Sequence, residues 1–254
     1  MPRPAPIPKL RELIARTLKS TVLIKIRLVD AQNNEKFNHA AGVAIASDTV
    51  LTCAHSWTEL KGSFKPAQNE PVRVWLDSDY GDDPDGSAAQ HSSVGDVKRD
   101  DSRDLAILHV PDLGATKIVR GVDNELAMGD DVFFIGHPLD YRPLVSTAIA
   151  SGKLVTSAGS HILILDGNIN LGNSGGPLLS RETGKLLGII IRKSGDRSDN
   201  GLAGIRDPWF GSEAGREVVT SIAGLNDNVQ IGLGMAVRMQ DVEAFLSAQG
   251  FVDH

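Results

Sequence analysis

The sequence predicts an all-β fold, because its apolar residues gather in short runs that turn-forming residues separate. Runs at 22–26, 71–76 and 161–165 have the length and the valine, isoleucine and leucine content that favour strands. The chain of 254 residues holds 26 glycines and 12 prolines, which suit the many turns between such strands. Since 41% of the residues are hydrophobic, the chain can bury one core or two small ones.

Helical spacing of apolar residues is found near both ends of the chain. Residues 9–19 follow a proline-rich segment, 1–8, and predict an amphipathic helix with apolar positions at Leu10, Leu13, Ile14 and Leu18. We expect this helix to pack against the chain's own core, with an oligomer contact or a membrane-surface role as alternatives. A second short helix is predicted at 239–248 from the spacing of Val242, Phe245 and Leu246.

The segment 172–178, Gly-Asn-Ser-Gly-Gly-Pro-Leu, presents a serine on a tight turn. In such a turn the backbone N–H groups of Gly172 and Ser174 can point at one spot, where the oxyanion of an acyl-transfer intermediate would lie. Glycine at 172 tolerates positive φ and lets a substrate approach the backbone closely. Ser174 becomes a nucleophile only if a base removes its proton, so the chain must also supply that base.

A base and an orienting acid precede the serine. His55 follows the apolar runs 42–46 and 50–51 and is predicted at the end of a strand. Asp104 is predicted at the first residue of another strand, 104–110. The order His, Asp, Ser differs from that of subtilisins and of α/β-hydrolases. The residues after Ser174 predict strands rather than the helix that a hydrolase elbow requires.

Segments 51–55, 104–108 and 172–178 resemble the trypsin-like serine proteases, and in particular the bacterial HtrA/Deg branch. Further matches to that branch are found at 134–138, 166–170 and 231–237. The resemblance covers roughly residues 20–250. It implies two antiparallel six-stranded β-barrels, the first over about 20–115 and the second over about 125–238, with the active site in the cleft between them. Domain 20–254 would then be the protease, preceded by segment 1–19.

The resemblance also implies a role for each matched residue. Ser174 would be the nucleophile, His55 the general base, and Asp104 the group that orients the imidazole, with Gly172 and Ser174 N–H as the oxyanion hole. Such a serine endopeptidase forms an acyl-enzyme and needs no cofactor and no metal. The alternatives are a catalytically silent protease-fold binding module and an esterase-like hydrolase. Asn173 replaces the aspartate of digestive members, so we expect no zymogen cleavage.

The resemblance also locates the substrate pocket. Its floor would be Asn168, six residues before the nucleophile, and its walls would come from Ile190, Ile191 and Arg192. A neutral amide cannot compensate a buried lysine or arginine, so we expect small or medium apolar residues before the scissile bond. The alternative is that the positive charge of Arg192 favours acidic residues near the scissile bond.

Composition limits the partners and the compartment. The net charge of −6 without a basic stripe argues against nucleic acid. No apolar run approaches the ~18 residues of a membrane span. The segment 1–8 lacks the apolar core of a signal peptide, and the single cysteine, Cys53, forms no internal disulfide, so we expect a cytoplasmic protein. The expected partner is a protein or peptide substrate, and a regulatory protein partner or a homo-oligomer stays open.

Because the sequence ends at His254, we expect this protease domain to lack the PDZ domain that commonly follows it in the HtrA/Deg branch. The acidic loop 77–86 does not fit an EF-hand, and a solvated loop is favoured over a calcium site. The segment 194–228 is polar and glycine-rich, and we expect it to shape specificity or access. We expect Cys53 to be a small buried residue, His137 and His161 to be structural, and His109 to lie at the surface.

Overall fold

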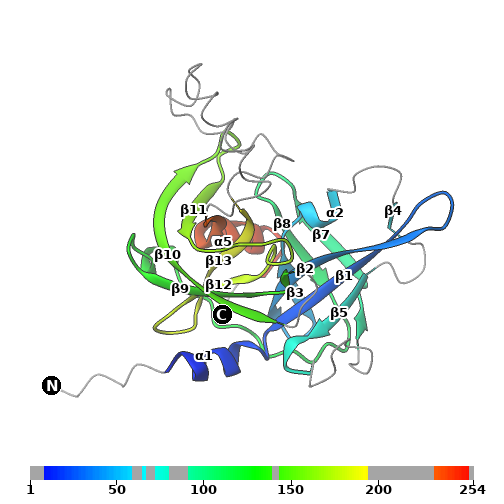
Figure 1. The fold of residues 1–254 in the computed structure, drawn as a ribbon, viewed down its shortest axis with the longest axis horizontal. Coiled ribbons are helices and arrows are strands. Elements are labelled where there is room, and N and C mark those ends of the chain that lie inside the picture. The colour runs from blue at the N-terminus through cyan, green and yellow to red at the C-terminus, as the bar shows by residue number, and fades with distance from the viewer. Residues whose placement is uncertain are drawn as a thin grey trace.

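The computed structural model describes residues 9–58, 65–66, 72–79, 91–138, 143–193 and 232–251. These residues form two halves built from antiparallel strands, with helices near the ends of the chain (Figure 1). The expected all-β class is therefore confirmed. We expected a solvated loop at 77–86, and its residues 80–86 lie outside the described residues. The segment 194–228, which we expected to shape specificity or access, also lies outside them.

The first half is a strongly curled sheet of eight described strands. Its strand order is β6-β5-β1-β2-β3-β8-β7, and β4 pairs with the far end of β1. The sequence led us to expect six strands here; the additional members are the two-residue strands β4 and β6. The bounds of the strands are β1 Thr21–Val29, β2 Glu35–Ala46, β3 Thr49–Thr52, β4 Lys65–Pro66, β5 Val72–Leu76, β6 Ser92–Ser93, β7 Asp96–Asp100 and β8 Leu105–His109.

The second half is a closed barrel in the order β10-β11-β14-β13-β12-β9, as the resemblance implied. Closing the sheet removes its edges, so each strand pairs on both sides. The bounds of its strands are β9 Asp131–Gly136, β10 Leu144–Val155, β11 His161–Asp166, β12 Pro177–Ser180, β13 Leu186–Lys193 and β14 Leu233–Arg238. A 3₁₀ turn, η2 (Asp123–Glu125), lies in the connection between the halves, and another, η1 (Asp77–Asp79), follows β5.

The two-residue period of the strands sorts apolar side chains into separate cores. In β1, Val22, Ile24 and Ile26 fill the interior of the first half. In β13, Ile190 points into the second barrel, whereas Ile189 and Ile191 point the other way, into the contact between the halves. Successive side chains of a strand face opposite sides, so one strand serves both cores.

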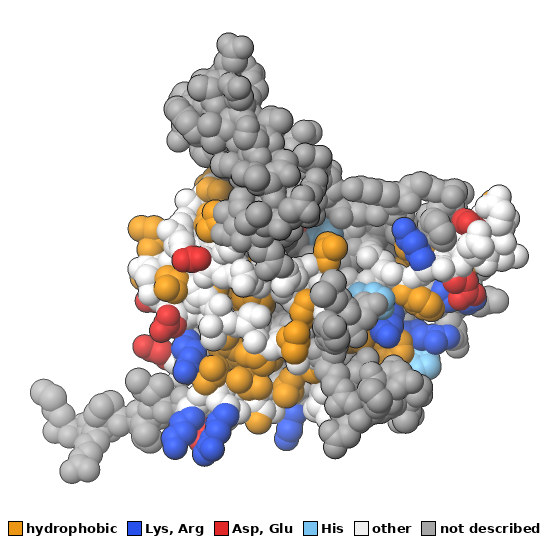
Figure 2. Space-filling model, in the orientation of Figure 1, with side chains coloured by type: hydrophobic (Ala, Val, Ile, Leu, Met, Phe, Trp, Pro, Cys, Tyr) orange, Lys and Arg blue, Asp and Glu red, His pale blue; other side chains and the backbone are white. Residues whose placement is uncertain are grey.

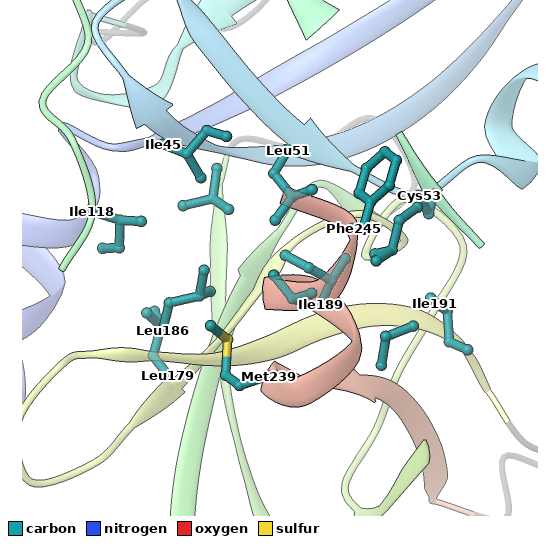
Figure 3. Close-up of a cluster of buried hydrophobic side chains, with 14 of the residues drawn as sticks. Ile45, Leu51, Cys53, Ile118, Leu179, Leu186, Ile189, Ile191, Met239 and Phe245 are labelled. Atoms are coloured by element: carbon teal, nitrogen blue, oxygen red, sulfur yellow. The ribbon is translucent and has the colours of Figure 1, made fainter. Parts of the chain in front are cut away.

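A third apolar cluster joins the two halves and includes both terminal helices. α5 (Met239–Ala248) inserts Val242, Phe245 and Leu246 between side chains from β3 and β13, as Figure 3 shows. α1 (Leu10–Thr17) adds Leu13, which is buried, so the N-terminal helix packs on the chain's own core as expected. Among the described helices, none has the length and apolar character needed to cross a bilayer.

Surface charge is mixed on the face shown in Figure 2. Lysine and arginine side chains are interspersed with acidic ones there, and the described part of this face carries no continuous basic stripe. Apolar side chains also reach this surface, which is common for soluble proteins.

Phe245 should contribute strongly to stability, because its ring is buried in the cluster that joins the halves. We expect Phe245→Ala to lower the free energy of unfolding by about 3–5 kcal/mol, measured by denaturant titration. Ser247→Ala, on the exposed side of the same helix, should change it by less than about 0.5 kcal/mol. Equal effects of the two variants would contradict the packing of α5 in the core.

Candidate active site

His55 is held by both oxygens of the Asp104 carboxylate, one at its imidazole and one at its backbone N–H. His55 is the first residue of α2 (His55–Thr58), three residues beyond the end of β3. Its Nδ1 lies 2.8 Å from Asp104 Oδ2, and its backbone N–H donates to Asp104 Oδ1, also at 2.8 Å. A carboxylate accepts hydrogen bonds, so Nδ1 carries the proton and Nε2 is left as the basic nitrogen. The paired contacts fix the orientation of the ring.

Asp104 directly precedes β8 rather than beginning it, and its backbone is strained. Its φ is 58°, a left-handed conformation that aspartate adopts more readily than most residues but at some cost in energy. The preceding turn supports it. Oδ1 of Asp100 accepts the N–H groups of Ser102 at 3.0 Å and Arg103 at 3.1 Å. Partial burial raises the pKa of Asp100, but the Ser102 hydroxyl, the Arg103 guanidinium and the Arg103 N–H lower it, and their sum holds the pKa below its ordinary value.

The loop that carries Ser174 leaves two backbone N–H groups without an internal acceptor. Within this loop, Asn173 N–H donates to Asn170 O at 3.0 Å, and Gly175 N–H donates to Ile190 O at 2.7 Å. Among the described residues, no acceptor takes the N–H of Gly172 or of Ser174. Buried N–H groups are normally paired, so the alternation of used and unused donors is what an oxyanion hole requires.

Two glycines make this loop possible. Gly172 has φ 94° and Gly175 has φ 83°, both in the left-handed region. A Cβ on Gly172 would lie 2.0 Å from His137 O, and one on Gly175 would lie 2.0 Å from Thr52 Oγ1. Neither position therefore has room for any other residue.

The backbone around Ser174 also contacts strands of the first half, so the serine lies at the junction of the two halves. The N–H of Ala41, on β2, donates to Ser174 O at 2.8 Å. Gly175 packs against Thr52 and Cys53, the residues that lead from β3 to His55. The structure thus collects His55 and Asp104 from the first half and Ser174 from the second half in one region.

In this conformation the hydroxyl of Ser174 is turned toward β13. Its Oγ donates to Ile191 O at 3.1 Å, while Nε2 of His55 lies 3.8 Å from Cys53 Sγ. Catalytic hydrogen bonds are often long or misaligned before substrate binds, so this arrangement is compatible with a serine–histidine pair. A change in the Ser174 rotamer is the smallest movement that would redirect the hydroxyl.

Cys53 is fully buried, as expected, but it also acts on the imidazole, which sequence reasoning did not include. Burial of the ring lowers the pKa of His55, whereas the Cys53 sulfur and the Asp104 carboxylate raise it. The balance raises the pKa of His55 well above its ordinary value of 6.5. A raised pKa keeps more of the imidazole protonated near neutral pH, so the free base form grows as the pH rises. The sequence signal for this effect was that Cys53 lies two residues before His55.

The proposed pocket residues are not gathered into one described surface. Asn168 is exposed and faces Gly232, whereas Ile190 is fully buried in the second barrel and so lines no surface pocket. Ile191 faces the contact between the halves, with its carbonyl at Ser174. The side chain of Arg192 lies outside the described residues. Among those that are described, no group of three or more His, Cys, Asp or Glu could hold a metal ion.

Comparison with known proteins agrees with this arrangement. The family model described as a trypsin-like peptidase domain matches residues 40–189, more than half of the chain. The chain is 36% identical over 129 residues to the serine protease Do-like HtrA of Bacillus subtilis, covering 46% of this chain and 28% of that protein. It is 34% identical over 116 residues to the chloroplastic protease Do-like 1 of Arabidopsis thaliana, covering 41% of this chain and 26% of that one. The match thus spans little more than a quarter of these relatives.

One solved structure is similar to the chain over its whole length. The active form of the Rv3671c protease from M. tuberculosis superposes with a TM-score of 0.65 at 18% identity, covering 100% of this chain and 94% of that one. At this identity the likeness establishes the fold, which is the chymotrypsin-like arrangement expected from the sequence.

The electrostatic influences on His55 can be tested without measuring catalysis. Cys53→Ala and Asp104→Asn each remove a group that raises the pKa of His55, so each should lower that pKa. An NMR titration of the His55 imidazole measures it directly. Ser174→Ala removes a neighbouring hydroxyl that carries no charge and should leave the pKa in place. A pKa that stays constant or rises in both of the first two variants would contradict this account of the site.

Proposed function

Because this chain belongs to the trypsin-like peptidase domain family, we propose that it is a serine endopeptidase acting through Ser174, His55 and Asp104. The observation that carries the proposal is the combination of two features. Both Asp104 oxygens hold His55, one at its imidazole and one at its backbone N–H, and two N–H groups of the serine loop are unpaired among the described residues. HtrA-type proteases among the relatives support the same class of reaction. The substrate would be a protein or a peptide.

The proposed reaction begins with attack of Ser174 Oγ on the scissile carbonyl carbon, while Nε2 of His55 takes the hydroxyl proton. The carbonyl oxygen becomes an oxyanion and accepts hydrogen bonds from the N–H groups of Gly172 and Ser174. His55 then donates its proton to the leaving amine, which leaves an acyl-enzyme. Water attacks the ester with His55 again as base, and Ser174 regains its proton. Asp104 stays ionised and stabilises the imidazolium throughout.

Labelling of the folded protein by a fluorophosphonate tests the activated serine. We expect labelling of the native protein, none of Ser174→Ala, and a loss of turnover of about 10⁴-fold or more in His55→Ala. Peptide cleavage measured in parallel separates the alternatives. Labelling and ester hydrolysis without peptide cleavage would indicate an esterase-like hydrolase, and a folded native protein that is not labelled would indicate a silent binding module.

The substrate preference we propose depends on Asn168. A neutral, exposed amide at the pocket floor should favour small or medium apolar residues before the scissile bond, which a cleavage-site peptide library measures. Asn168→Asp places a carboxylate there and should raise kcat/KM for arginine over alanine by about tenfold or more. Asn33→Asp makes the same change in the exposed β1–β2 turn and should have no effect. A native preference for lysine or arginine would overturn the assignment.

A further inference from the structure

A second histidine–carboxylate pair lies buried behind the serine loop. Nε2 of His137 lies 3.0 Å from Oδ1 of Asp77, and both side chains are 0% exposed. Asp77 begins η1, directly after β5 of the first half, while His137 directly follows β9 of the second (Figure 1 places β5 and β9 in different halves). The pair therefore joins the halves through polar side chains, in addition to the apolar cluster that lies between them.

Stability alone does not account for this pair. The two atoms are at hydrogen-bond distance, but their angles are not those of a hydrogen bond, so among the described residues none of the four side-chain polar atoms has a hydrogen-bond partner. Each buried polar atom without a partner costs about 1–3 kcal/mol. Well-packed apolar residues commonly replace a buried charged pair without loss of stability. A role other than stability is thus needed to explain why Asp77 and His137 are present.

The position of His137 indicates that role. Its N–H donates to Gly172 O at 3.0 Å, and its carbonyl oxygen occupies the place that a Cβ on Gly172 would need. Its neighbour Gly136 packs just as closely on Asn173, because a Cβ there would lie 2.7 Å from Asn173 Cα. The backbone of 136–137 therefore contacts the peptide group between Gly172 and Asn173 from the β9 side, next to both unpaired N–H groups.

Asp77 is itself anchored. The N–H of the next residue, Ser78, donates to Leu18 O at 3.1 Å, just after the end of α1. The Asp77 carboxylate thus belongs to a segment that is hydrogen-bonded to the residue just after α1.

We propose that Asp77 and His137 are positioning residues for the oxyanion hole. The buried contact between the Asp77 carboxylate and the His137 imidazole links residue 137 to the first half. The backbone of 136–137 then holds Gly172 in its left-handed conformation, with its N–H and that of Ser174 available to substrate. This inference rests on the proposed function, since it assigns these residues to the same site. Neither residue touches the reacting atoms.

Asp77→Asn tests the proposal, because it keeps the shape of the side chain and removes its charge. Removing one oxyanion donor costs about 10²–10³-fold in kcat, so a loosened loop should lower kcat by about 10- to 100-fold. KM should change by less than about threefold, since the loss is confined to the transition state. The control is His109→Asn, which alters an exposed imidazole 3.8 Å from the Asp48 carboxylate and should leave both constants unchanged. An Asp77→Asn protein that is folded and retains full kcat would overturn the inference.

The double variant Asp77→Ala with His137→Met separates positioning from packing. It removes both polar groups at a nearly constant summed side-chain volume, so it should fold at least as stably as Asp77→Asn, and it decides the matter if the single variant does not fold. Positioning predicts that kcat stays low although stability returns. Recovery of kcat together with the melting temperature would mean that the pair only fills space, and the inference would be wrong.

Amide NMR keeps this test distinct from that of the proposed function. The Gly172 and Ser174 amide resonances should shift in Asp77→Asn and in the double variant, and should keep their positions in His109→Asn. This readout needs no turnover, so it holds even if the native protein proves inactive and the proposed function fails. Unchanged Gly172 and Ser174 resonances in both Asp77 variants would overturn the inference while leaving the proposed function standing.

Discussion

The apolar contact between the two halves is the constraint on which the site depends. Each half has its own interior, but His55 and Asp104 belong to one half and Ser174 to the other. Their relative positions are therefore set by the cluster in which Leu51 and Ile189 meet the side chains of α5 (Figure 3). Close-packed interiors resist small displacements, so this cluster holds the halves to the tolerance that a shared catalytic site requires.

α5, the helix that fills this contact, also contacts the turn at 100–103 that precedes Asp104. Asp241 of α5 accepts the His161 N–H at 2.5 Å, and its Oδ1 lies 3.8 Å from Nε of Arg103. Ser160 Oγ donates to Ser102 O at 2.7 Å, which ties β11 to the same turn. The strained Asp104 thus follows a turn that the second half holds from two directions. Apolar packing sets the distance between the halves. The polar contacts of Asp241 and Ser160 hold the turn before Asp104, whose strained backbone needs such support.

Much of the fold and the site could be predicted from the sequence, because both rest on local patterns. The strand runs follow the two-residue period, and the glycines around Ser174 are required by the turn itself. Long-range contacts were not predictable in this way. Nothing near His137 in the sequence points to Asp77. A shift of one position along β13 decides that Ile190 faces the barrel core while Ile191 faces the contact between the halves. The positive φ of Asp104 likewise depends on a turn closed by Asp100.

The acyl transfer that we propose would use rigid and adjustable parts of the site. The proposed oxyanion donors lie in backbone that glycines and the 136–137 segment hold, so little reorganisation would be needed when charge develops on a substrate. The hydroxyl of Ser174 is the adjustable part, since its bond to Ile191 O is replaced by rotation about a single side-chain bond. Burial of the ring lowers the pKa of His55, whereas Cys53 and Asp104 raise it, so more of the imidazole is free to accept a proton as the pH rises. The proposed oxyanion donors are backbone N–H groups, so their availability does not depend on pH in this way.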